Sequence, residues 1–211
     1  ESRAPGDGRC AIAFCRLCVI DPAGSAQPMT SPDGLTTVAF NGEIYNYRKI
    51  RNLLASEGRR FRTEGDTEVL LHLYRRSGLE MLASLDGMFA FAIYDARAGR
   101  LMLARDRLGE KPLWYAALAD RIVFASEAPA LLQHPLVDSS LDRKSITYYM
   151  TVGYIPAPRS AWAGMRKLLP GHYLCAETSV GAPVRYWAPK PVELPPAGPE
   201  LIAQVRAAVG D

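Results

Sequence analysis

Met88-Phe-Ala-Phe-Ala-Ile-Tyr94, the turn Asp95-Ala-Arg-Ala-Gly-Arg100 and Leu101-Met-Leu-Ala104 form the stretch that decides the fold class. Its two apolar runs are short and flank a polar turn, which is typical of a β-hairpin. Two further short strands are predicted at 113–117 and 122–125. Strand hairpins kept apart from paired helices indicate an α+β fold, with antiparallel sheets and helices packed outside, and not a parallel Rossmann-type sheet.

The segment before this hairpin predicts helices. Ile50 and Leu54 keep the three-to-four spacing of an amphipathic helix, which we expect to end at Gly58. A second helix is predicted to begin near Asp66, and a short third helix follows Gly78.

Strands are also predicted towards both ends of the chain. The apolar run Cys10–Ile20 predicts a buried strand, and Leu35–Phe40 predicts a second one. The pair Asn41-Gly42 that follows is the strongest short signal for a hairpin turn, so the pattern alone predicts a turn there. Near the other end, short strands are predicted at about 172–176 and 184–187.

The C-terminal third predicts one helix before a linker. Ser140 can cap a helix that buries Ile146, Tyr149 and Met150. Six prolines between 183 and 199 predict a linker, and the residues after it predict the start of another helix.

Composition and charge exclude several classes of protein. The 211 residues are 48% hydrophobic and 22% charged, which is typical of a globular chain. The net charge of +3 makes no electrostatic case for binding nucleic acid or an anionic membrane. No apolar run approaches the ~20 residues that span a bilayer, and no export leader opens the chain, so a cytoplasmic location is predicted. The chain begins at Glu1, which we interpret as a fragment, a processed chain or a trimmed domain.

The cysteines are predicted to be structural. Cys10, Cys15 and Cys18 have a C-x4-C-x2-C spacing that overlaps one iron–sulfur pattern. On a strand, however, the side chains of Cys15 and Cys18 point to opposite faces and cannot bind one metal. We therefore expect small apolar side chains in a core, with reduced thiols, and no metal site.

Three sites have residues that suit binding chemistry. Arg16 is the only charge between Cys10 and Ile20, so it requires either an acidic partner or a substrate carboxylate. Asn41-Gly42 is either a turn or a pair of donors to one oxyanion. Asp66 is either a helix N-cap or a partner for a substrate ammonium. Together the three describe a pocket for an α-amino acid whose side-chain carbonyl is attacked.

Several motifs extend this pattern in one unbroken order over residues 10–187. They are Arg16-Leu-Cys-Val-Ile-Asp21, Phe40-Asn-Gly-Glu-Ile-Tyr-Asn46, Gly65-Asp-Thr-Glu-Val69, Leu85-Asp-Gly-Met-Phe-Ala-Phe-Ala-Ile-Tyr-Asp95, Ala104-Arg-Asp-Arg-Leu-Gly-Glu-Lys-Pro-Leu-Trp-Tyr115, Phe124-Ala-Ser-Glu127, Gly153-Tyr-Ile-Pro-Ala-Pro158 and Leu169-Pro-Gly-His-Tyr-Leu174. The set resembles the glutamine-hydrolysing asparagine synthetases and, more broadly, the class II glutamine amidotransferase domain.

The resemblance implies an N-terminal-nucleophile hydrolase fold, an αββα sandwich of two antiparallel sheets, here with the first strand missing. It also assigns a substrate site. Asn41 and Gly42 would form the oxyanion hole, Glu43 would line the pocket and Asp66 would bind the α-ammonium of glutamine. The carboxylate of glutamine would be held by Arg16 and the main chain of Leu17, Cys18, Val19 and Ile20.

The resemblance further implies a division of labour. In the family an N-terminal cysteine attacks glutamine, and the ammonia passes to a synthetase domain in which ATP and Mg²⁺ activate aspartate. Here Glu1 stands first, and neither the Cys-Gly-Ile strand nor the Ser-Gly-Gly-Leu-Asp-Ser loop of the synthetase domain is found. We therefore expect the glutaminase part of an asparagine synthetase, inactive alone and without a cofactor of its own. A missing first strand would leave an exposed pairing edge.

The predicted organisation is a glutaminase domain over 1–187, incomplete at its N-terminus, and a segment over 188–211 that leads to an absent synthetase domain. The predicted partners are glutamine and a synthetase domain in cis or in trans, with a homodimer as an option. Two alternatives stay open. One is a non-catalytic remnant that binds an amino acid or a synthetase partner, and the other is an amidotransferase acting on another carboxylate, such as a sugar acid.

Overall fold

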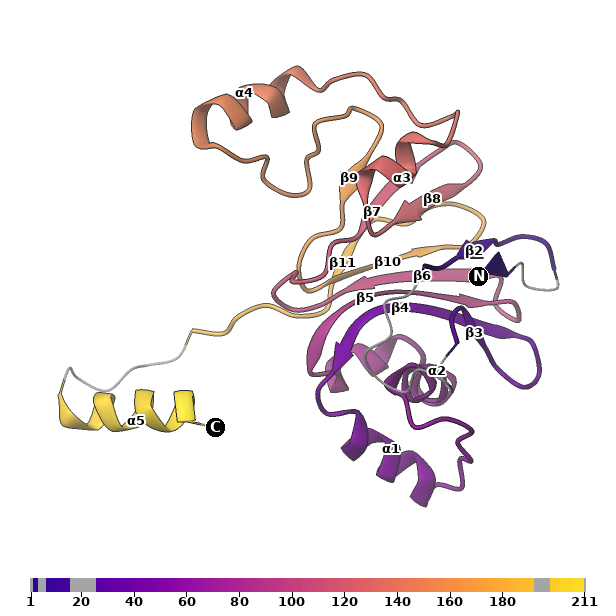
Figure 1. Ribbon diagram of the computed structural model, residues 1–211, viewed down its shortest axis with the longest axis vertical. Coiled ribbons are helices and arrows are strands. Elements are labelled where there is room, and N and C mark those ends of the chain that lie inside the picture. The colour runs from indigo at the N-terminus through magenta and orange to yellow at the C-terminus, as the bar shows by residue number, and fades with distance from the viewer. Residues whose placement is uncertain (1, 4–6, 16–25, 192–197, 211) are drawn as a thin grey trace.

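A six-stranded antiparallel sheet forms the centre of the computed structural model, which describes residues 2–3, 7–15, 26–191 and 198–210 (Figure 1). The strand order is β11-β10-β6-β5-β4-β3. The strands are β3 (Met29–Thr30), β4 (Thr36–Ile44), β5 (Gly87–Asp95), β6 (Arg100–Arg105), β10 (His172–Ala176) and β11 (Val184–Arg185). The β5–β6 hairpin and the antiparallel pairing confirm the prediction from the sequence.

A second, smaller antiparallel sheet faces the first. It consists of β8 (Ile122–Ala125), β7 (Trp114–Ala117) and β9 (Arg166–Lys167), in that order. Near the N-terminus β1 (Ser2–Arg3) pairs with β2 (Ile12–Ala13).

Helices cover the outer faces of both sheets, as Figure 1 shows. One side carries α1 (Tyr47–Ser56), α2 (Asp66–Ser77) and the short 3₁₀ helix η1 (Gly78–Ser84); the other carries α3 (Ala128–Leu132). The helix α4 (Arg143–Val152) lies beyond α3 and buries only Ser145. The result is a helix–sheet–sheet–helix sandwich of α+β class, as predicted. The last helix, α5 (Pro199–Gly210), lies apart from these layers. None of the helices in the described ranges has the length and apolarity needed to cross a bilayer.

The alternation of side chains along β4 explains how two cores share one sheet. Val38 and Phe40 are buried in the cluster between this sheet and α1 and α2, whereas Ala39 belongs to the cluster between the two sheets. Because α2 is buried at every position from Asp66 to Tyr74, it is the helix that anchors the outer layer. A third cluster, around Leu131, fills the space between the second sheet and α3.

The long strand predicted over Cys10–Ile20 is wrong for the residues that the structure describes. Only Ile12 and Ala13 pair, because their partner β1 is two residues long. Cys10 is half-buried and packs against the cluster between the two sheets, whereas Cys15 is exposed, so the prediction of a core side chain is wrong for Cys15. The part of this prediction that includes Cys18 lies outside the described residues.

The helix predicted after Ser140 is present as α4, but its cap and its buried face differ from the prediction. Asp142 is the N-cap, because its carboxylate accepts hydrogen bonds from the Lys144 N–H at 3.2 Å and the Ser145 hydroxyl at 2.6 Å. The buried residue is Ser145, whereas Tyr149 and Met150 are 53% and 80% exposed.

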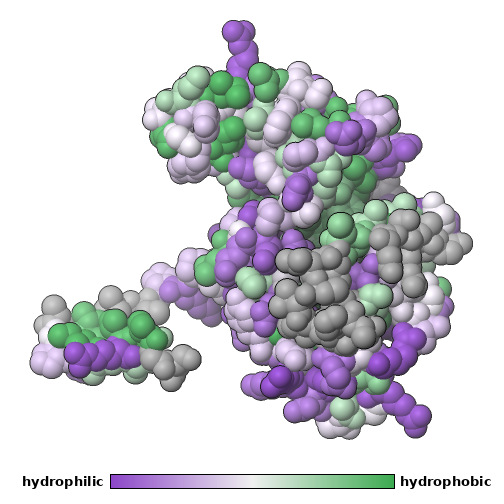
Figure 2. Space-filling model, viewed as in Figure 1, coloured by the Kyte–Doolittle hydropathy of each residue, from purple (hydrophilic) through white to green (hydrophobic). Residues whose placement is uncertain are grey.

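Two helices therefore present apolar side chains to solvent. Figure 2 shows apolar atoms on the outer surface around α4 and along α5. The exposed large apolar side chains on α5 are Ile202, Val205 and Val209, whose spacing places them on one face of the helix.

Candidate functional site

The Asn41-Gly42 pair lies inside strand β4 and is not the hairpin turn that the pattern predicted. Asn41 pairs with Ala90 and Gly42 with Phe89 across the β4–β5 ladder. Gly42 has a φ of +144°, and a Cβ on it would lie 2.0 Å from the Met88 carbonyl oxygen. The glycine is thus required by the close approach of two strands, which the pattern of residues could not distinguish from a turn.

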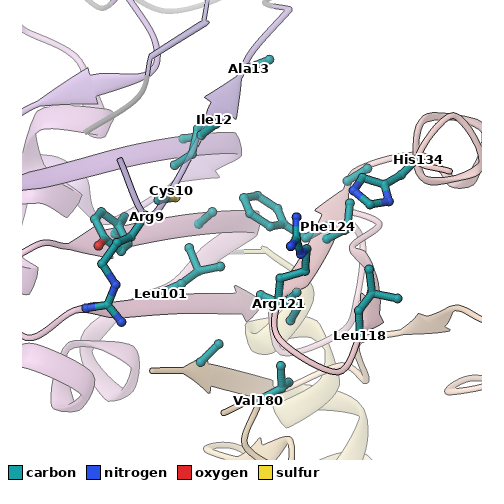
Figure 3. Close-up of a pocket in the computed structure, with 18 of the residues that line it drawn as sticks. Arg9, Cys10, Ile12, Ala13, Leu101, Leu118, Arg121, Phe124, His134 and Val180 are labelled. Atoms are coloured by element: carbon teal, nitrogen blue, oxygen red, sulfur yellow. The ribbon is translucent and has the colours of Figure 1, made fainter. Parts of the chain in front are cut away.

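A cleft of about 1380 Å³ opens between the two sheets, and Asn41 lines it. Side chains from the N-terminal segment, from β6 and from the β7–β8 hairpin surround the space, as Cys10, Leu101 and Phe124 show in Figure 3. Within the described ranges the side-chain amide of Asn41 makes no hydrogen bond. No described residue therefore competes with a ligand in the cleft for this amide.

The second sheet borders this cleft with an edge strand. Among the described residues β8 pairs only with β7, and Ile122, Val123, Phe124 and Ala125 all line the cleft. All four side chains are only partly buried. The cleft thus has a pairing edge on one side and the Asn41 amide on another.

Asp66 begins helix α2 and is tied to the end of β4. The N-cap is Gly65, so Asp66 is the first helical residue and not the cap that one interpretation predicted. Its Oδ2 atom accepts a hydrogen bond from the Ile44 N–H at 3.1 Å, and the residue is only 5% exposed. Burial raises the pKa of the Asp66 carboxyl, more than the hydrogen bond from Ile44 lowers it; the nearby charge of Glu43 also raises it.

The raised pKa of Asp66 predicts a pH dependence of folding. As the pH rises above the unfolded-state pKa near 3.8, the unfolded chain loses this proton before the folded chain does. Between the unfolded-state pKa and the higher folded-state pKa of Asp66, the free energy of unfolding therefore falls as the pH rises. We expect the Asp66→Asn variant to gain stability relative to the wild type between pH 4 and pH 8 in urea unfolding. A difference that is constant over this range would contradict the prediction.

The structure brings four of the predicted site residues to one end of β4. Asn41, Gly42 and Glu43 follow one another on the strand, and Asp66 reaches the same strand at Ile44. The cleft itself is lined by Asn41 and not by the other three. The residues predicted to bind the glutamine carboxylate lie outside the part of the chain that the structure describes. They are Arg16, Leu17, Cys18, Val19 and Ile20.

Asp106 is a structural support of this site that the sequence analysis missed. It is fully buried, and its carboxylate accepts hydrogen bonds from the main-chain N–H groups of Leu108 and Lys111, both at 3.0 Å. It also accepts from the Phe89 N–H at 3.3 Å, and Phe89 is the ladder partner of Gly42. The only signal in the sequence is an acidic residue directly after the apolar strand that ends at Arg105.

Glu68 supports the segment that leads into α2. This carboxylate is 2% exposed and accepts hydrogen bonds from the N–H of Arg62 at 2.9 Å and from the N–H and hydroxyl of Thr63 at 2.7 and 2.8 Å. Although burial opposes it, these bonds hold the pKa of Glu68 below its usual value. The residue stands in the Gly65–Val69 motif, yet nothing in the sequence distinguishes it from an exposed helix carboxylate.

No three His, Cys, Asp or Glu side chains within the described ranges are grouped so that they could hold a metal ion.

Comparison with known proteins places these features in context. A model of a glutamine amidotransferase domain matches residues 4–187. The glutamine-hydrolysing asparagine synthetase 1 of Bacillus subtilis (strain 168) is 38% identical over 165 residues, which are 78% of this chain and 26% of that protein. A putative glutamine-hydrolysing asparagine synthetase of Mycobacterium tuberculosis (strain ATCC 25618 / H37Rv) is 39% identical over 194 residues, which are 87% of this chain and 30% of that protein.

A solved structure agrees with the fold. The glutamine phosphoribosylpyrophosphate amidotransferase of B. subtilis, in complex with ADP and GMP, matches with a TM-score of 0.53 at 26% identity. The match covers 76% of this chain and 32% of that one. This chain thus spans about a quarter to a third of the length of each of these three proteins.

Proposed function

Because the chain belongs to the family of class II glutamine amidotransferase domains, we propose that it forms the glutamine site of an enzyme that hydrolyses the side-chain amide of glutamine to glutamate and ammonia. The observation that carries the proposal is the amide of Asn41 at the cleft, which bonds to none of the described residues and lies on the strand to which the buried carboxylate of Asp66 is hydrogen-bonded. An amide donor on a rigid strand and a helix carboxylate that is hydrogen-bonded to the same strand suit the two ends of an amino acid with a side-chain carbonyl.

We assign roles to the residues accordingly. Asn41 and the N–H of Gly42 stabilise the oxyanion that forms when the amide carbon is attacked, Glu43 lines the pocket, and Asp66 binds the α-ammonium. The α-carboxylate goes to Arg16 and the main chain at 17–20. Removing one oxyanion donor in such sites typically costs about 10²–10³ in rate.

The nucleophile is not among the internal cysteines. Burial and the charge of Asp7 raise the pKa of Cys10 to about 11, so this thiol is protonated at neutral pH. Cys10, Cys15, Cys18 and Cys175 are all internal and have no α-amine to assist them. We propose that these 211 residues alone bind glutamine without hydrolysing it, and that the cleft beside β8 and Asn41 suits a strand that carries the family's N-terminal cysteine.

The ammonia is proposed to serve the synthesis of asparagine. The relatives described above are named glutamine-hydrolysing asparagine synthetases, so aspartate is the acceptor we propose, and another carboxylate such as a sugar acid is the alternative. ATP and Mg²⁺ would act in a synthetase domain of the kind that these relatives' names imply. The free thiols of Cys10, Cys15 and Cys175 suit the cytoplasmic location that we propose.

We propose a synthetase domain, in the same chain or a separate one, as the partner that receives the ammonia. The division into a glutaminase domain over 1–187 and a connecting segment over 188–211 follows from this proposal. The exposed apolar side chains of α4 and α5 suit a protein contact, either with that domain or with a second copy of the chain.

The Asn41→Ala variant tests the site. Loss of one neutral hydrogen bond to the ligand carbonyl is expected to weaken L-glutamine binding about 3- to 10-fold in isothermal titration calorimetry. The control is Asn52→Ala, because Asn52 is exposed on α1. This variant is expected to bind L-glutamine with the affinity of the wild type. A wild-type protein that does not bind L-glutamine would contradict the proposal, and ammonia release that Asn41→Ala abolishes would contradict the proposed inactivity.

A further inference from the structure

We propose that Gln27 is a positioning residue, which holds the Asn41-Gly42 strand and the Asp66 helix at the separation that glutamine requires. This inference rests on the proposed function, because it concerns how the oxyanion donors and the ammonium partner are kept in register. Gln27 precedes the first strand of the six-stranded sheet and stands in none of the motifs that indicated the site.

The side chain of Gln27 completes the sheet beside Asn41. Its Oε1 accepts a hydrogen bond from the Phe40 N–H at 2.6 Å, and its Nε2 donates to the Phe40 carbonyl at 3.0 Å. In the β3–β4 register Met29 faces Val38, so the same register places residue 27 opposite Phe40. The amide thus makes both ladder bonds of the position directly before Asn41.

The same amide reaches the start of α2. Its Nε2 also donates to the Thr67 hydroxyl at 3.3 Å, and Thr67 directly follows Asp66. Asp66 in turn accepts from the Ile44 N–H at 3.1 Å. Strand β4 is therefore joined to the helix at two points, Phe40 through Gln27 and Ile44 through Asp66, and Asn41, Gly42 and Glu43 lie between them.

Burial makes this connection specific. Gln27 is 7% exposed and Thr67 is 2% exposed, so neither side chain can exchange its partner for water without opening the layer. An apolar residue of the same size would fill the space but would leave Phe40 with two unpaired main-chain groups. A displacement of about 1 Å between Asn41 and Asp66 is enough to weaken strongly a site that contacts both. Loss of this connection should therefore weaken the binding of ligands that contact Asn41 and Asp66 together.

The test compares two ligands in the full 211-residue chain. L-glutamine uses both Asn41 and Asp66, whereas L-2-aminopentanoate has the same ammonium and carboxylate but no side-chain amide. The variant is Gln27→Met, which keeps the length of the side chain and removes its hydrogen bonds. The control for general destabilisation is Leu131→Ala, because Leu131 is fully buried in the cluster around α3, away from β4.

We expect Gln27→Met to reduce the preference for L-glutamine over L-2-aminopentanoate about tenfold in calorimetric titrations. Leu131→Ala is expected to keep the wild-type preference. Equal losses for both ligands in Gln27→Met would overturn the proposal, since a purely structural role lowers both affinities together.

Hydrogen exchange separates this proposal from the proposed function. We expect the Phe40 and Ile44 amides to exchange at least about tenfold faster in Gln27→Met than in Leu131→Ala, because the local connection opens before the protein unfolds. A wild type that binds neither amino acid would contradict the proposed function, and the exchange rates would still decide whether Gln27 holds the two elements together. Equal exchange in the two variants would overturn the proposal.

Discussion

Replacing Asp66 with asparagine is expected to reduce the affinity for L-glutamine about 100-fold, or about 2.7 kcal/mol. The ammonium of the ligand would lose a charge-assisted hydrogen bond to a carboxylate that is only 5% exposed, and bonds of this kind are worth more than neutral ones. The asparagine side chain has nearly the same shape and its carbonyl oxygen can still accept from the Ile44 N–H. Titration calorimetry at pH 7 measures the loss.

The raised pKa of Asp66 provides an internal control for this variant. Since the ionised carboxyl is disfavoured by burial, removing the charge is not expected to lower the thermal stability at pH 7. The matched control is Asp138→Asn, because Asp138 is exposed and its carboxylate bonds within its own turn, where it accepts from the Ser140 N–H at 2.9 Å. An Asp66→Asn protein that is stable and binds glutamine as the wild type does would remove Asp66 from the site.

The Gly42→Ala substitution is expected to destabilise the fold by about 4 kcal/mol, since backbone strain and overpacking each cost about 1–3 kcal/mol. A Cβ at this position would lie 2.0 Å from the Met88 carbonyl oxygen and 2.8 Å from the Phe89 Cα. Both are main-chain atoms of β5, and they cannot move aside because β4 and β5 pair along nine residues. The φ of +144° adds strain that any side chain would feel.

Gly58→Ala is the matched control for this effect. Gly58 also has a positive φ, of +86°, but a Cβ there would meet nothing within 4 Å. We expect it to cost only about 1 kcal/mol, from backbone strain alone. Urea unfolding of the two variants measures the difference. Equal losses would show that the close approach of β4 and β5 does not restrict position 42.

Much of the fold could be predicted because its signals are local. The spacing of Ile50 and Leu54 predicted α1, and the apolar runs around the turn at 95–100 predicted the β5–β6 hairpin. These patterns reflect which face of one element is buried, and that requires no knowledge of the partner. The helix α4 shows the limit, because Tyr149 and Met150 have the expected period but no element within the described ranges covers them.

The candidate site was predicted less completely. The residue types at Asn41, Gly42 and Asp66 pointed to an amino-acid pocket, yet the pattern alone favoured a turn for the first pair and allowed a helix cap for the third. Both interpretations failed for the same reason: the conformation at Gly42 depends on Met88, and the partner of Asp66 is Ile44 on another element.

The sequence by itself determined the α+β class, the helices α1 and α2, the β5–β6 hairpin and the residue types at the proposed glutamine site, because each depends on neighbours along the chain. Only the tertiary structure decided that Asn41-Gly42 is extended and that Asp66 is hydrogen-bonded to Ile44, 22 positions before it. It also decided that Gln27 joins Phe40 to Thr67, which lies 40 positions after Gln27. Such bonds form between segments brought together by packing of the layers. Buried polar groups must find partners there, and the local sequence does not name them.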